Sequence, residues 1–361
     1  MMRFQNKWLR FLVLLPIPLI VAGINYVVDP SALYHDNTEA MARSMAAGNK
    51  TWFAHSNVNE REVKRHLIEA MPREVDCIAV GPSLIMGVRS DTVGTQSFYN
   101  LSESGADFYD ILAQFALLDL HEITYHRVIF CVDSYFFDEK LYRTLTRSQG
   151  LKPYAQYMID TLEQKDPIRP HGPANSWKEP VKSLLSPSYF QASIAALKKE
   201  GGHSLIGARW GIVNENYEGI YYMPDGSIVY AVEAQNRTGD YVTKDAENYN
   251  IEYQFSKGGH IDPYSKEIFE KLIQYLLKKN ISVELFLCPV APSLWERINS
   301  DDYPSIPELE MFAHEMAQEY NLRITGTYNP YCLRMSDEDF YDARHVRHDL
   351  LTKYFDFRPY K

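Results

Sequence analysis

The chain has 361 residues, of which 45% are hydrophobic and 23% are charged, a balance typical of a folded globular protein with one large domain or two ordinary ones. Its formal net charge is −10, and because Arg3, Lys7 and Arg10 contribute +3, residues 11–361 carry −13. A surface this acidic repels phosphate backbones, which argues against nucleic acid as a partner.

The first element is an apolar segment, residues 11–28, with no charged residue in eighteen positions. As a helix it would rise about 27 Å at 1.5 Å per residue, which matches the hydrocarbon core of a bilayer. Basic residues precede it and Asp29 follows it, so the N-terminus is expected in the cytoplasm. We predict that residues 1–30 form a single-pass anchor in the cell membrane and that residues 31–361 form an extracytoplasmic domain.

Two other interpretations of the apolar segment remain open. A cleaved signal peptide would use Val21-Ala22-Gly23 as its small-residue cleavage site. A buried helix of a soluble protein would have a similar composition.

Short apolar runs alternate with amphipathic helical patterns along most of the remaining chain. The runs that predict strands lie at residues 74–83, 96–105, 126–134, 281–290 and 322–328. The helical patterns lie at residues 106–120, 268–277 and 309–317. Continuously apolar strands that alternate with such helices indicate a parallel sheet covered on both faces, a three-layer α/β/α architecture.

Residues 139–260 interrupt this alternation with a polar and aromatic insertion. Within it, residues 221–230 place a Pro-Asp-Gly turn between two alternating runs, which predicts a hairpin. An insertion that follows a strand's carboxyl end lies over the region where open α/β sheets bind ligands, so we expect a lid or substrate platform. A subdomain without a role in binding is the alternative. Some of its aromatic residues are candidates for stacking on sugar rings, although most are expected in the core or the hairpin: Trp177, Trp210, Tyr217, Tyr221 and Tyr222.

The four cysteines give no sign of a metal or redox site. Cys77, Cys131 and Cys288 lie within apolar runs, and no Cys-x-x-Cys spacing involves them or Cys332. Because cysteine is a common small buried hydrophobe, we expect free buried thiols and neither a cofactor nor a metal.

A candidate nucleophile follows the first predicted strand directly. Gly81 allows a sharp turn, and Ser83 then stands at the carboxyl end of the sheet where the next helix begins. Backbone amides at such a position stabilise developing negative charge. Taken alone the pattern is weak, because a serine here is more commonly a helix N-cap.

Asp342 and His345, one turn apart near the C-terminus, strengthen the case for Ser83. Their loop follows the fifth predicted strand and therefore leaves from the same edge of the sheet. Asp342 would fix the imidazole tautomer while His345 takes the proton of Ser83. The amides of Ser83, Leu84 and Gly105 are the candidate oxyanion donors.

The same C-terminal turn allows two other interpretations. Asp342, His345 and His348 have a spacing that would supply three metal ligands, although no cluster elsewhere completes a site. The other interpretation is that these residues simply begin a solvent-exposed helix.

These ordered motifs resemble the SGNH (GDSL-like) hydrolases, which carry Gly-x-Ser after strand one, Gly after strand two and Asp-x-x-His near the C-terminus. The chain is more closely similar to membrane-anchored bacterial relatives, through Asp29-Pro30 after the anchor and the Phe-Tyr-Asp that ends at Asp342. The resemblance covers the anchor and residues 75–135 and 264–350. It implies a flavodoxin-like sheet and a role in O-acylation of extracellular polymers, as in the D-alanine transfer protein of teichoic acid modification and in polysaccharide O-acetylation proteins.

Two departures from that pattern bear on activity. Ser83 follows Pro82, where Gly-Ser-Ser or Gly-Thr-Ser is more usual. The family's third block supplies an oxyanion Asn, but the third strand here ends on Asp133 and Ser134. An anionic Asp133 does not donate, and one missing donor costs on the order of 10²–10³ in rate.

Two functional hypotheses follow. The first is an exported serine esterase or O-acyltransferase that acts on cell-envelope carbohydrate, a polysaccharide or teichoic acid-like polymer, through an acyl ester of Ser83. The second is a non-catalytic binding or scaffold protein of the same fold. The resemblance implies a membrane-bound O-acyltransferase as a partner in either case.

Overall fold

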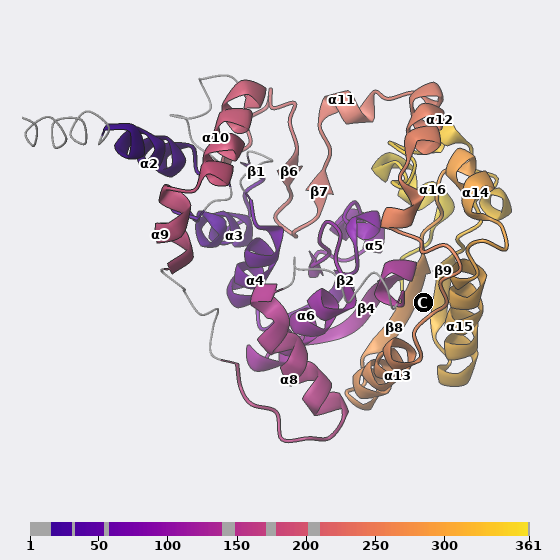
Figure 1. The fold of residues 1–361 in the computed structure, drawn as a ribbon. Coiled ribbons are helices and arrows are strands. Elements are labelled where there is room, and N and C mark those ends of the chain that lie inside the picture. The colour runs from indigo at the N-terminus through magenta and orange to yellow at the C-terminus, as the bar shows by residue number, and fades with distance from the viewer. Residues whose placement is uncertain are drawn as a thin grey trace, which may run out of the picture.

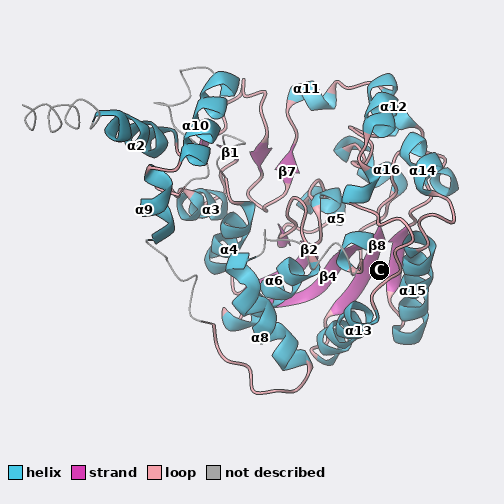
Figure 2. Cartoon of the chain, in the orientation of Figure 1, coloured by secondary structure: helices cyan, strands magenta, loops and turns pink. Residues whose placement is uncertain are grey.

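A computed structural model of the chain describes residues 16–30, 33–53, 58–138, 149–170, 178–200 and 210–359. Its centre is a five-stranded parallel sheet with the strand order β3-β2-β4-β8-β9. The strands are β2 (Glu74–Val80), β3 (Phe98–Asn100), β4 (Thr124–Val132), β8 (Ser282–Leu287) and β9 (Arg323–Gly326). Each of the five predicted runs thus contains a strand, and the parallel sheet is confirmed (Figures 1 and 2).

Alternate residues of the central strands enter two different cores, which explains why the carboxyl halves of β2 and β4 are continuously apolar. In β4, Val128, Phe130 and Val132 pack in one core, whereas Ile129 and Cys131 pack in the other. The first core contains α6 (Phe108–Leu120), α8 (Lys152–Leu162), α13 (Pro263–Lys278) and α15 (Ser305–Tyr320). The second contains α5 (Ser90–Val93), α16 (Leu351–Tyr354) and the C-terminal tail. Helices therefore lie on both sides of the sheet.

The sheet reverses its winding between β2 and β4. β3 pairs with one side of β2, while β4 and the later strands extend from the other side. Open α/β sheets bind ligands at the carboxyl ends of the strands where such a reversal occurs, because the loops diverge there. The loops that follow β2, β3 and β4 all begin at this carboxyl edge of the sheet.

A second, antiparallel sheet joins the N-terminal part of the chain to the insertion. Its order is β5 (Trp210–Ile212), β1 (Thr51–Phe53), β6 (Tyr221–Tyr222) and β7 (Ile228–Val229). The pairing of β6 with β7 confirms the predicted hairpin. Lys64 on α4 (Glu60–Ala70) fixes the hairpin turn, because its buried Nζ donates to the carbonyls of Gly226 and Asn100 at 2.5 and 2.7 Å.

Other parts of the insertion lie in two regions of the structure, the main core and the carboxyl edge of the main sheet. α8 packs against α6 within the main core, and α12 (Gly239–Asn248) lies above the carboxyl edge of the main sheet with α11 (Val232–Gln235) before it (Figure 1). The insertion therefore contributes to the core as well as to the ligand-binding edge.

The described part of the predicted anchor is α2 (Pro16–Val28). Its last turn contacts α9 (Lys178–Leu184) and α10 (Pro187–Glu200), and Asn25 Nδ2 donates to the carbonyls of Ser183 and Leu184 at 3.1 and 2.9 Å. No helix among the described residues has both the length and the apolar character needed to cross a bilayer. Residues 11–15 of the predicted span lie outside the described residues.

All four cysteines are described and carry free thiols. Cys77, Cys131 and Cys288 are buried, as expected for residues in apolar strands, and Cys332 is exposed.

Candidate active site

Ser83 stands on a sharp turn at the carboxyl end of β2. Gly81 has φ +147°, and a Cβ at this position would lie 2.6 Å from the Cβ of Cys131, so a larger residue does not fit. The 3₁₀ helix Ser83–Ile85 begins immediately, with Pro82 at its N-cap position and no side-chain cap. Because its hydroxyl makes no capping hydrogen bond, the N-cap interpretation of Ser83 is wrong.

A tight loop presents Asp342 and His345 to Ser83. Phe340 and Val346 form an antiparallel bridge, and the amide of Tyr341 donates to the carbonyl of His345 at 2.8 Å. Inside the loop, Asp342 Oδ1 accepts the amides of Arg344 and His345, both at 2.9 Å. The carboxylate therefore shapes the turn that carries the imidazole.

The three predicted residues form one chain of hydrogen bonds. Ser83 Oγ lies 2.8 Å from His345 Nε2, and His345 Nδ1 lies 2.8 and 2.9 Å from the two oxygens of Asp342. These residues are 262 and 3 positions apart in the sequence. The structure thus brings together the nucleophile, base and carboxylate in the order that acyl transfer requires.

The charge on Asp342 determines the direction of each hydrogen bond. Burial alone would raise the pKa of Asp342, but His345 and the two amides outweigh it and hold that pKa well below its ordinary value. An ionised carboxylate only accepts, so Nδ1 of a neutral His345 carries the proton and Nε2 accepts from the Ser83 hydroxyl. The side chains of His345 and Asp342 are 21% and 27% exposed, so solvent reaches the site from the cleft.

The cleft in front of Ser83 has a volume of about 310 Å³ and is formed by loops from both halves of the chain. Its lining includes the expected triad together with Leu84 and Gly105. The insertion supplies one wall: Arg237, Tyr241, Asp245, Tyr249, Tyr253 and Gln254. Ligands of carbohydrate size fit a cavity of this volume.

From the sequence we expected the insertion near the ligand-binding edge but did not name these wall residues, although their spacing gave one indication of them. Tyr241, Asp245 and Tyr249 recur every four residues, the spacing that places side chains on one face of a helix. Asp245 also holds the loop that carries Asp342 and His345, because its Oδ2 accepts the amide of Ala343 at 2.9 Å.

The candidate oxyanion donors lie at the same end of the cleft. The first hydrogen bond of the 3₁₀ helix runs from the Ile85 amide to the Pro82 carbonyl at 3.2 Å, so the amides of Ser83 and Leu84 precede it. Gly105 adopts φ +57°, and its carbonyl accepts from Arg61 Nη2 at 3.2 Å. Arg61 is itself fixed by a bidentate ion pair with Asp110, which holds the Gly105 loop in place.

Asp133 faces the cleft from the end of β4. It is 3% exposed, and its carboxylate accepts from Arg344 Nη2 at 2.6 Å, from Gln254 Nε2 at 3.0 Å and from the amide of Tyr135 at 3.0 Å. Asp133 is therefore an acceptor at the position where the family resemblance places a donor.

His348 does not line the cleft that contains Asp342 and His345. Its ring stacks on Tyr230 with centroids 4.8 Å apart, and it covers Gly87 so closely that a Cβ there would lie 2.0 Å from His348 Cδ2. Among the described residues, no three His, Cys, Asp or Glu side chains gather so as to hold a metal ion. His345 is also committed to Ser83 and Asp342, so the geometry supports neither the metal interpretation nor a solvated helix start.

The predicted sugar-stacking residues pack elsewhere. Tyr222 is buried against Phe53 with ring centroids 4.8 Å apart, and Tyr217 stacks on Trp52 at 5.7 Å. Trp210 and Tyr221 belong to the same small sheet, and none of these four insertion residues lines the cleft. These four residues pack in and around the small sheet, as expected for most of the group, and Trp177 lies outside the described residues.

Comparisons with known proteins do not identify the chain. Its sequence matches no protein-family model and no curated protein. The chemistry of the cleft must therefore be inferred from its geometry.

Replacing Asp342 by Asn should leave the fold intact but lower the reactivity of Ser83 by a factor on the order of 10⁴, because the tautomer of His345 is no longer fixed. The rate constant for covalent labelling by a fluorophosphonate measures this loss. Asp339→Asn is the control, since Asp339 accepts from Ser336 in the same C-terminal segment but does not line the cleft. Equal labelling rates for Asp342→Asn and the wild type would contradict the assigned role.

Acid should destabilise the fold through His348. Burial, with smaller contributions from Arg89 and His345, lowers the pKa of His348 to about 3. A histidine with a lowered folded pKa contributes its full stability above the unfolded value of about 6.5 and loses that contribution as the pH falls. Between pH 7 and pH 5 the loss should reach up to about 2 kcal/mol.

Denaturant unfolding of the wild type and His348→Phe, which keeps an aromatic ring against Tyr230, measures this effect as the difference between their pH dependences. His314→Phe, at an exposed position on α15, controls for the chemical change. If His348→Phe and the wild type lose stability in parallel from pH 7 to pH 5, His348 is not the group responsible.

Proposed function

We propose that the chain is an SGNH-type serine esterase or O-acyltransferase that is anchored in the cell membrane and acts on cell-envelope carbohydrate outside the cytoplasm. The observation that carries this proposal is the continuous hydrogen-bonded chain from Ser83 through His345 to Asp342 at the wall of an open cleft. The strand order also supports it. Numbered along the chain, the main sheet runs 2-1-3-4-5, which is the flavodoxin-like order.

The reaction follows from the positions of the three side chains. His345 Nε2 takes the proton of Ser83 Oγ as Oγ attacks the carbonyl carbon of an acyl ester. The tetrahedral intermediate then collapses as the bond to the leaving alcohol breaks and His345 returns the proton to that alcohol. Water or a sugar hydroxyl next gives its proton to His345 as it attacks the acyl-serine. His345 then returns that proton to Ser83 Oγ as the bond from Oγ to the acyl carbon breaks, while Asp342 stays ionised throughout.

The cleft wall supports a carbohydrate acceptor. Tyr241, Tyr249 and Tyr253 combine apolar ring faces with hydroxyl groups, which suits the CH faces and hydroxyls of sugar rings. Arg237 packs over Tyr241, with its Cζ 4.5 Å from the ring centroid, and adds a hydrogen-bond donor at the rim. A polysaccharide or teichoic acid-like polymer is therefore the proposed substrate class.

The anchor and the protein partner rest on sequence rather than on the described structure. Residues 11–28 fit a single span with the N-terminus in the cytoplasm. Asp29, which follows α2, accepts the amides of Leu33 and His35 at 2.7 and 2.9 Å, so its carboxylate ties the end of α2 to the start of the next described segment. A membrane-bound O-acyltransferase that delivers acyl groups is the partner implied by the family resemblance.

A non-catalytic envelope binding or scaffold protein is the second candidate function. Asp133 favours it, because this carboxylate stands where related enzymes carry an amide donor and does not stabilise an oxyanion itself.

Labelling with a fluorophosphonate should distinguish the two functions. The wild-type protein should be labelled covalently, because the probe reacts with an activated serine. Ser83→Ala should not be labelled, and Ser134→Ala, a control at another buried serine, should behave as the wild type does. A folded wild type that takes no label would favour the scaffold function, and labelling of Ser83→Ala at the wild-type level would remove Ser83 as the nucleophile.

A further inference from the structure

We infer that Arg344 is a catalytic residue whose Nη1 donates a hydrogen bond to the acyl oxygen as Ser83 attacks, an inference that rests on the proposed serine chemistry. Arg344 lies between Asp342 and His345 in the loop that carries the base. Its side chain is only 7% exposed, yet it lines the same cleft as Ser83 and Gly105.

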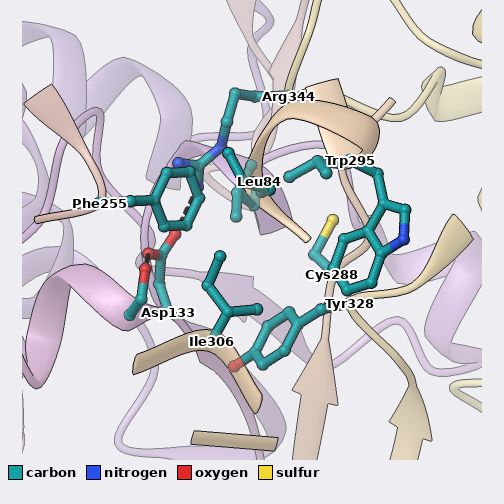
Figure 3. A pocket seen from close by; sticks show the side chains of 11 residues that line it. Leu84, Asp133, Phe255, Cys288, Trp295, Ile306, Tyr328 and Arg344 are labelled. Carbon is teal, nitrogen blue, oxygen red and sulfur yellow. Dashed lines mark hydrogen bonds and ion pairs between the residues drawn. The ribbon is translucent and has the colours of Figure 1, made fainter. Parts of the chain in front are cut away.

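The guanidinium group is held in one orientation. Nη2 donates to Asp133 Oδ2 at 2.6 Å, and the ring of Phe255 lies alongside, with its centroid 5.3 Å from Arg344 Cζ (Figure 3). Asp133 is itself fixed by Gln254 and by the amide of Tyr135. A donor that is positioned in advance costs little reorganisation when charge develops in the transition state.

Nη1 of Arg344 is buried, and no described atom meets it at hydrogen-bond distance and angle, although the Tyr249 hydroxyl lies close enough to the guanidinium to help raise its pKa. An unpaired buried donor costs about 1–3 kcal/mol, and more for a charged group, so it calls for an explanation. The other described side chains with such an atom are Arg89, Glu103, Gln114, Tyr222 and Ser305, and none of these lines the cleft. Among the described residues, Arg344 is therefore the only one that lines the cleft of Ser83 and also has a buried side-chain polar atom without a hydrogen-bond partner.

Charge balance at the cleft fits a catalytic donor better than an anion-binding site. Asp133 neutralises Arg344, so the pair does not attract an anionic ligand by net charge. Burial alone would lower the pKa of Arg344, but Asp133 and Tyr249 outweigh it and raise that pKa, so the guanidinium stays protonated. A neutralised pair with one free N–H favours the partial charge of a developing oxyanion.

The surroundings of the ion pair also strengthen the interaction. It borders a small chamber of about 20 Å³ (Figure 3). The remaining lining is largely apolar: Leu84, Phe255, Cys288, Val290, Trp295, Ile298, Ile306 and Tyr328. A low local dielectric increases the strength of a charged hydrogen bond.

The proposed role of Arg344 accounts for an Asp at position 133, where the family resemblance leads one to expect an Asn. The carboxylate does not donate to the oxyanion, but it positions a guanidinium that does. Arg344 would then replace the amide donor that the family resemblance leads one to expect at the end of the third strand.

The test compares fluorophosphonate labelling rates, because the phosphonyl oxygen occupies the place of the acyl oxygen. Arg344→Gln should slow labelling by about 10²–10³-fold. Arg344→Lys keeps a positive charge beside Asp133 but loses the guanidinium fork, so it should also be slow. Asp133→Asn combined with Arg344→Gln should recover at least part of the rate, because it introduces an amide donor at the end of β4.

Arg127→Gln is the matched control. Arg127 pairs with the buried Glu284 at the other end of β4, so this substitution breaks a similar ion pair away from the cleft. It should lower stability to denaturant while each folded molecule keeps the wild-type labelling rate. Arg344→Lys keeps the test informative if Arg344→Gln does not fold.

The outcomes separate this inference from the proposed function. If the wild type is labelled at Ser83 and the folded Arg344 variants are labelled equally fast, Arg344 is only a structural partner of Asp133 and the inference is wrong. If the folded wild type takes no label, the proposed function fails and this inference fails with it.

Discussion

The Asp342 carboxylate organises the C-terminal loop and the base that the loop carries. It accepts two backbone amides within the turn and, at the same time, the Nδ1 proton of His345. These contacts keep the carboxylate ionised, and an ionised carboxylate leaves His345 only one tautomer in its neutral form. The hydrogen bond from Ser83 to Nε2 follows from that tautomer, so one carboxylate links the shape of the loop to the reactivity of a serine 259 positions earlier in the chain.

The serine side of the cleft is held by an independent set of buried polar contacts. Asn100 Nδ2 donates to the carbonyls of Ile85 and Val88 at 2.8 and 2.9 Å, which fixes the segment that follows Ser83. Lys64 then ties the carbonyl of Asn100 to the hairpin. Buried charges of this kind add little net stability, but they restrict the loops to one arrangement, as a preorganised site requires.

The sequence was sufficient to predict the strands, the hairpin and the convergence of Ser83 with His345 and Asp342. Each of these depends on a local pattern, either a continuous apolar run or a polar residue at the end of one, combined with the rule that parallel strands end at one edge. Residues whose roles depend on long-range pairing were not predictable. The Asp133–Arg344 pair joins positions 211 apart, and neither residue shows a local sign of the other.

The insertion also contains residues whose positions depend on long-range pairing and were not predictable from sequence. Trp210 and Tyr222 were candidates for stacking on sugar rings, although the core or the hairpin was expected for most of their group. Strand pairing with Thr51–Phe53 places them in a small sheet, and sequence alone does not reveal that partner. The sequence places His348 in a polar stretch next to the site residues, but in the structure its ring packs on Gly87 and Tyr230.

Peptide mapping of the fluorophosphonate adduct is the most direct measurement of the central claim, that Ser83 is an activated nucleophile. Trypsin cleavage after Arg73 and Arg89 releases residues 74–89, a peptide in which Ser83 is the only hydroxyl side chain. The account predicts that mass spectrometry finds the phosphonyl group on this peptide. An adduct on another peptide, with residues 74–89 unmodified, would contradict it.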